Sequence, residues 1–138
     1  MGDALLDPTY IYASFVRGLL ESAVVPKFLN GITGHGFLKI MRADVAVRYE
    51  ITALPEVPEV LQYLTDQLGM APSEAYSTLN MGAGYVAIVS PEDVDETLRV
   101  ARETGHDPLV AGEVADGERA LAISSLGIEY RDDDFRLR

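Results

Sequence analysis

Apolar side chains recur at helical spacing in three stretches of the chain. In the first stretch, Ile11, Phe15 and Leu19 stand four residues apart and so fall on one helix face. Prolines and glycines flank the stretches and mark where helices begin or end. The sequence therefore predicts helices over residues 11–22, 57–68 and 91–104, and shorter helices over 36–42 and 72–79.

Residues 45–51 carry the clearest strand pattern. Val47, Tyr49 and Ile51 alternate with smaller or polar residues, which predicts one buried and one wetter face. Shorter apolar runs between turn residues predict further strands over 27–33, 85–89, 108–114 and 119–123.

The order of these elements suggests how the strands pair. The turn at Asp116-Gly117 predicts a hairpin of strands 108–114 and 119–123. Strand 85–89, its following helix and strand 109–114 predict a right-handed βαβ unit. The charged tail over 131–135 is expected to fray. We expect one α+β layered domain, a mixed β-sheet covered by helices, over residues 1–138.

Composition narrows the classes of partner. The formal net charge of −11 argues against nucleic acid, because a phosphate backbone needs a basic surface. No apolar run reaches the length of a membrane span, and the absence of cysteine excludes disulfides and fits a reducing compartment. We expect a cytoplasmic protein without a membrane partner.

Two glycine-spaced loops are the candidate functional site. Thr33, Gly34, His35 and Gly36 precede a helical run, and glycine lets backbone N–H groups approach an anion such as phosphate. Asn80, Met81, Gly82 and Gly84 precede an apolar strand in the same manner. Either loop can also be a tight turn or a bulge that serves packing alone. The spacing fits neither a P-loop nor G-x-G-x-x-G.

Four segments resemble motifs of one enzyme family, in the family's order. Ile32-Thr33-Gly34-His35-Gly36 resembles the I-T-G-G-G loop of aminoimidazole ribonucleotide (AIR) synthetase, or phosphoribosylformylglycinamidine cyclo-ligase. Thr78 to Gly84 resembles its T-F-N-M-G-x-G. Leu5 to Tyr12 is similar to its L-L-x-P-T-x-I-Y, and Gly112-Glu113-Val114 to its G-E-V. The match covers the family's C-terminal domain.

This resemblance implies a role in purine biosynthesis. The family uses ATP to activate the formyl oxygen of formylglycinamidine ribonucleotide, and ring closure then gives aminoimidazole ribonucleotide. Its N-terminal ATP-binding domain is expected to be absent from these 138 residues. ATP and magnesium are thus implied for the complete enzyme, and this domain alone is expected to bind no cofactor, to contribute no catalytic or metal-binding residue and to be inactive.

The implied partners are a phosphorylated ribonucleotide and an N-terminal AIR synthase domain or companion chain. We also expect self-association, as a dimer, through an apolar wall that includes Tyr10, Tyr12, Phe37 and Tyr85. His35 stands where the family has glycine, and it either hydrogen-bonds a phosphate or is a tolerated surface substitution. The alternative function is a non-catalytic module that binds a phosphorylated metabolite or a partner chain.

Overall fold

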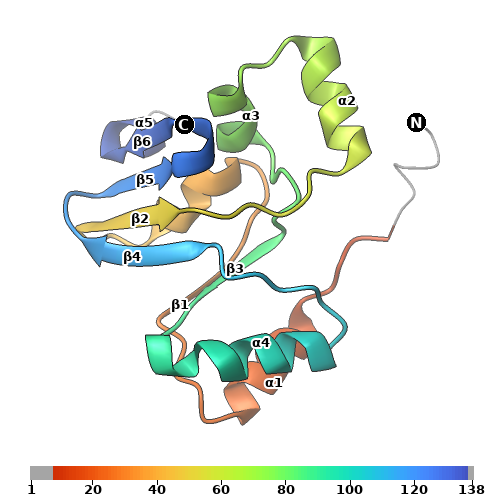
Figure 1. Cartoon of the computed structure of the whole chain (residues 1–138), viewed down its shortest axis with the longest axis vertical. Coiled ribbons are helices and arrows are strands. Elements are labelled where there is room, and N and C mark those ends of the chain that lie inside the picture. Colours follow the sequence, from red (N-terminus) through yellow and green to blue (C-terminus); the bar gives the residue numbers. More distant parts are fainter. Residues whose placement is uncertain (1–7, 137–138) are drawn as a thin grey trace. The chain divides into compact units, whose positions relative to one another are not determined.

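The computed structural model describes residues 8–136, which divide into two compact units (Figure 1). The first unit holds the residues up to Asn30 and Tyr85–Leu109. The second unit holds Gly31–Gly84 and the chain from Val110 onward. None of the described helices is both long enough and apolar enough to span a membrane.

The first unit packs two helices beside a short pair of strands. Its elements are α1 (Ala13–Glu21), β1 (Phe28–Gly31), β3 (Tyr85–Ile88), the 3₁₀ helix η3 (Pro91–Asp93) and α4 (Val94–Glu103). The apolar faces of α1 and α4 meet in a core of Phe15, Leu19, Val24, Val100 and Ala101. A Cβ at Gly18 of α1 would meet Val100 Cγ1 at 3.0 Å, so the helices approach closely there.

The second unit is built on a four-stranded sheet. Its strands are β2 (Val47–Ile51), β4 (Gly112–Asp116), β5 (Ala120–Ile123) and β6 (Ile128–Arg131). Its helices are η2 (Gly36–Arg42), α2 (Glu59–Leu68), α3 (Pro72–Thr78), η4 (Ser124–Leu126) and α5 (Asp132–Arg136). The strand order β4-β2-β5-β6 places β2 beside both β4 and β5. β2 runs antiparallel to β4 and parallel to β5, which confirms the predicted α+β fold with a mixed sheet.

Buried side chains explain why β2 and β5 hold the centre of this sheet. All four residues of β5 are buried, and Tyr49 and Ile51 of β2 are buried beside them. Arg119, just before β5, is also largely buried. Its Nε donates to Met41 O at 3.0 Å, and its Nη1 lies 2.7 Å from Asp132 Oδ1, so the end of η2 is joined to α5.

Two predicted strand pairings were wrong. The expected hairpin does not form, because β2 lies between β4 and β5 and pairs with both. The expected βαβ unit does not form either, because β3 pairs with β1 while β4 belongs to the other sheet. Local turn and crossover rules favour neighbours in sequence, whereas the buried strand β2 comes from far earlier in the chain.

The C-terminal end also differs from the prediction. Residues 128–131 form β6, which the sequence pattern did not indicate. Asp132–Arg136, expected to fray, form α5. The side chain of Asp134 accepts a hydrogen bond from Arg131 N at 2.8 Å, which holds the start of this short helix. Tyr130 is buried in β6, and its hydroxyl donates to Ser73 O at 2.5 Å.

Candidate functional site

The loop from Thr33 to Gly36 is a tight turn that begins η2. His35 has φ 76° and Gly36 has φ 49°, so both are left-handed, whereas Gly34 is not among the residues with positive φ. Gly36 N donates to Thr33 O at 2.9 Å, and Leu38 N donates to His35 O at 3.1 Å. These two amides are therefore used within the turn. Thr33, Gly34 and His35 are exposed, while Gly36 is buried.

The loop from Asn80 to Gly84 is a second tight turn. Met81 has φ 44° and Gly82 has φ 92°. Asn80 closes the turn, because its Oδ1 accepts from Gly82 N at 3.2 Å and its carbonyl accepts from Ala83 N at 2.9 Å. Met81 is buried, whereas Asn80, Gly82 and Gly84 are half-buried. The Met81 side chain therefore belongs to the core.

The structure brings the two loops together in the second unit. Ile32 N, directly before the first loop, donates to Gly84 O at 2.9 Å. A Cβ at Gly36 would lie 2.2 Å from Tyr76 O and 2.6 Å from Leu79 O, so the first loop rests on the backbone that leads into the second. The eight predicted residues thus form one neighbourhood, with an exposed part at residues 33–35.

A lysine in this neighbourhood was not among the predicted site residues. Lys39 lies one turn into η2, and its Nζ donates to Thr33 Oγ1. The ammonium group is therefore held beside the exposed loop, in a chain whose net charge is −11. The signal in the sequence was the position of Lys39 three residues after Gly36, which places its side chain back over the start of the helix.

The four aromatic residues proposed for an exposed wall differ in how far they are exposed. Phe37 is only 3% exposed and packs edge-to-face on Tyr76, with ring centroids 5.1 Å apart, so its assignment to an exposed wall was wrong. In the first unit, Tyr12 stacks on Tyr85 at 5.0 Å, and burial raises the pKa of both hydroxyls. Tyr10 is 71% exposed.

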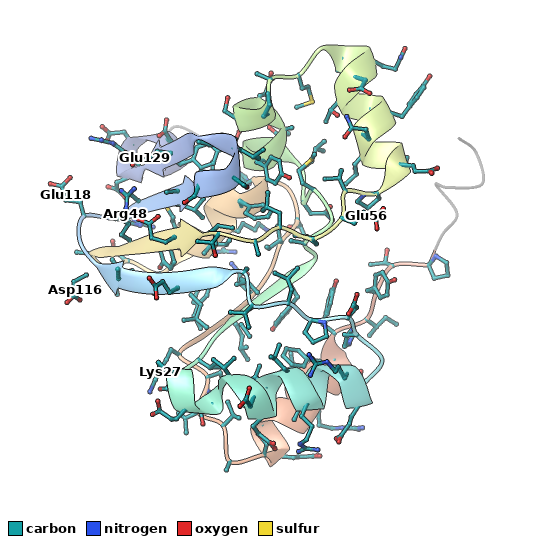
Figure 2. The ribbon with its side chains drawn as sticks, viewed as in Figure 1. Lys27, Arg48, Glu56, Asp116, Glu118 and Glu129 are labelled. Carbon is teal, nitrogen blue, oxygen red and sulfur yellow. The ribbon has the colours of Figure 1, made fainter. Side chains whose placement is uncertain are left out.

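Two surface hollows of the second unit have no residue of the two loops in their lining. One, of about 890 Å³, is lined mainly by charged side chains of the sheet and its turns. Figure 2 labels three of them, Arg48, Glu118 and Glu129. Arg48 donates to Glu50 and to Glu129, so the lining is partly neutralised by its own ion pairs. Within residues 8–136, no group of three acidic, histidine or cysteine side chains is arranged to hold a metal ion.

The sequence of the chain was compared with protein families and with curated proteins. No family model matches the chain. A phosphoribosylformylglycinamidine cyclo-ligase from Methanothermobacter thermautotrophicus is 39% identical over 116 residues, which are 84% of this chain and 33% of the relative. A second cyclo-ligase, from Thermoanaerobacter sp. (strain X514), is 36% identical over 129 residues, covering 89% of this chain and 37% of the relative. Both alignments fall in the C-terminal part of the relative.

The chain is related to the C-terminal part of the phosphoribosylformylglycinamidine cyclo-ligases. It spans about a third of the length of these curated relatives. The crystal structure of the E. coli hydrogenase maturation protein HypE matches with a TM-score of 0.62 at 19% identity, over 88% of this chain and 38% of HypE. At that identity the likeness shows the fold alone.

The cyclo-ligase motifs can now be located in the structure. The I-T-G-G-G-like segment is the turn into η2, and the N-M-G-x-G-like segment is the turn into β3. Gly112-Glu113-Val114 begins β4. In the segment similar to L-L-x-P-T-x-I-Y, residues 5–7 lie outside the described part of the chain. Tyr12, at the end of that segment, stacks on Tyr85 in the first unit.

Proposed function

We propose that this chain forms one wall of the substrate cleft of a cyclo-ligase-like enzyme of purine biosynthesis in the cytoplasm. The reaction would be the ATP-dependent ring closure of formylglycinamidine ribonucleotide to aminoimidazole ribonucleotide. The part played by this chain is to bind and orient the ribonucleotide phosphate. ATP and magnesium would be held mainly by an N-terminal cyclo-ligase domain or companion chain.

The observation that carries this proposal is the junction of the two glycine loops with Lys39 beside them. Residues 33–35 are exposed, and Gly34 N donates to no other described backbone group. An ideal Cβ at Gly34 would meet nothing within 4 Å, so an anion has room to approach that amide. Each charge-assisted hydrogen bond to a phosphate oxygen contributes about 1.5–3 kcal/mol when well formed.

The charge of the whole chain opposes an anion at long range only. With a net charge of −11, distant carboxylates repel a phosphate. Beyond about 8–10 Å this repulsion is screened at physiological salt, whereas donors at the loop act at contact distance. Lys39 and the Gly34 amide should therefore decide the local balance. Binding is expected to be weak until a second surface closes the site, because the loops form an open surface and not a pocket.

Binding can be tested on the 138-residue chain alone. Ribose 5-phosphate is titrated while backbone amide shifts are followed, and residues 33–37 and 80–84 are expected to move. Lys39→Gln should weaken binding about tenfold, from the loss of one charge-assisted bond. Lys27→Gln in the first unit removes the same charge and should change little. If residues 33–37 and 80–84 do not respond, the loops serve the fold only.

Activity is tested separately. The purified chain with ATP, magnesium and formylglycinamidine ribonucleotide is expected to show no turnover. Addition of a cyclo-ligase N-terminal domain is the decisive step, and turnover that then depends on Lys39 supports the proposal. Phosphate binding without turnover in that mixture would instead favour the non-catalytic module. Sedimentation of both samples would show whether the chain pairs with itself or with the added domain.

A further inference from the structure

The strand β4 is an open edge of the four-stranded sheet. It pairs with β2 on one side, and no described strand lies on its other side. All of its residues are exposed, whereas every residue of β5 in the same sheet is buried. Figure 1 shows β4 along the outer side of β2. An edge of this kind presents backbone N–H and C=O groups that another strand can pair with.

The register of β4 against β2 shows which side chains share a face. Val114 lies opposite Tyr49, and Glu113 lies opposite Glu50. Residues directly opposite in a ladder point to the same face, so Val114 lies on the face where Tyr49 is buried. Tyr49 is 3% exposed, but Val114 is 41% exposed. The apolar face of the sheet therefore continues past its last covered strand.

The other face of β4 carries uncompensated negative charge. Glu50 is paired with Arg48, which also bonds Glu129. Glu113, although it faces Glu50 across the ladder, takes part in none of the ion pairs found among residues 8–136. Asp116 lies opposite Val47 and so shares the face of Val114, and Figure 2 shows it at the far end of the strand, pointing outward. Like charges opposite each other destabilise a sheet unless a cation lies nearby.

We propose that the free edge of β4 binds an extended segment of another protein in which lysine or arginine alternates with apolar residues. Such a segment adds a strand to the sheet through backbone hydrogen bonds. Its apolar residues cover Val114 on one face, and its basic residues lie beside Glu113 on the other. The alternation follows from the strand itself, since successive side chains point to opposite faces.

Charge decides against a second copy of this chain as the occupant. Pairing β4 with β4 would bring two sets of Glu113 and Asp116 together, from two chains that each carry a net charge of −11. Acidic side chains on an edge strand oppose self-pairing, and they do not oppose a basic strand.

The probe is an acetylated, amidated peptide that alternates lysine and valine between terminal threonines. It is titrated into the full chain at about 150 mM salt, where long-range attraction is screened. Amide shifts are expected at residues 112–116. The control peptide has the same composition with its lysines and valines in separate blocks, and it should bind at least about tenfold more weakly, because it cannot satisfy both faces.

Variants of the chain separate the edge from general electrostatics. Glu113→Lys should weaken binding of the alternating peptide at least about tenfold, since a cation then faces the incoming lysine. Asp107→Lys makes the same change in net charge in the first unit and should change the affinity less than about twofold. Equal binding of the two peptides, an unchanged affinity in Glu113→Lys, or shifts at residues 44–48 and 129–133 instead would each overturn the proposal. So would a dimer that Glu113→Lys abolishes, because the occupant would then be a second copy.

Discussion

Gly36 is the position at which the candidate site and the fold depend on each other most directly. Its φ of 49° is a conformation that L side chains adopt at a cost of about 1–2 kcal/mol. A Cβ there would also lie 2.2 Å from Tyr76 O and 2.6 Å from Leu79 O, and both contacts are with backbone. Relieving such an overlap shifts main chain, at a further cost of about 1–3 kcal/mol. Gly36→Ala is therefore expected to destabilise the second unit by about 2–5 kcal/mol.

Gly34→Ala is the matched control, two residues away in the same turn. Gly34 lacks a positive φ, and an ideal Cβ there would meet nothing within 4 Å. The same chemical change should therefore alter the free energy of unfolding by less than about 0.5 kcal/mol. The two variants add the same methyl group, at Gly36 against backbone oxygens and at Gly34 into open space, so the difference in their free energies of unfolding measures the effect of the backbone contacts and of the positive φ.

The measurement is urea unfolding followed by tyrosine fluorescence, since the chain has no tryptophan. For a chain of this size, about 2–5 kcal/mol corresponds to a fall in Tm of about 6–20 °C. Amide exchange should assign the loss to residues 31–84 and 110–136, because the contacts lie within the second unit. Should Gly36→Ala cost less than about 1 kcal/mol, or no more than Gly34→Ala, the account of the turn is refuted.

Three further predictions concern the second unit. Arg119→Gln should lower the free energy of unfolding in urea by about 2–4 kcal/mol, because it leaves the buried Met41 carbonyl unpaired. Asp44→Asn is the control and should lower it little, because the Asp44 carboxylate is 96% exposed. Tyr130→Phe should cost about 1 kcal/mol by the same assay, the value of one buried hydrogen bond. Hydrogen bonds from Arg48, and then from Arg131, hold the pKa of Glu129 below its ordinary value of 4.5; this stabilisation is present above about pH 4.5 and is lost as the pH falls below it. Unfolding midpoints should therefore fall less steeply with acid in Glu129→Gln than in the unchanged chain.

The sequence predicted the elements of this fold better than their pairing. Helical spacing placed α1, α2 and α4, and the alternation of residues 45–51 placed β2, because periodicity is a local property. Pairing is not local. β2 becomes the centre of the sheet because Tyr49 and Ile51 can be buried against β5, about 70 residues further along the chain. The turn at Asp116-Gly117 marked the reversal between β4 and β5 but not the strand that lies between them.

The candidate site shows the same division between local and non-local information. Glycine spacing identified two turns where backbone comes close to something, and both turns are present. The sequence pattern does not show whether a ligand or other backbone of the chain approaches the glycine. At both glycines the space is filled by backbone of the same unit. An ideal Cβ at Gly36 would lie 2.2 Å from Tyr76 O, and one at Gly82 would lie 2.3 Å from Glu56 O. These two glycines hold the loops in place, and in the proposed function Gly34 N and the Lys39 ammonium are the groups that would meet a phosphate. A phosphate site here should thus tolerate changes of side chain at His35 better than loss of charge at Lys39.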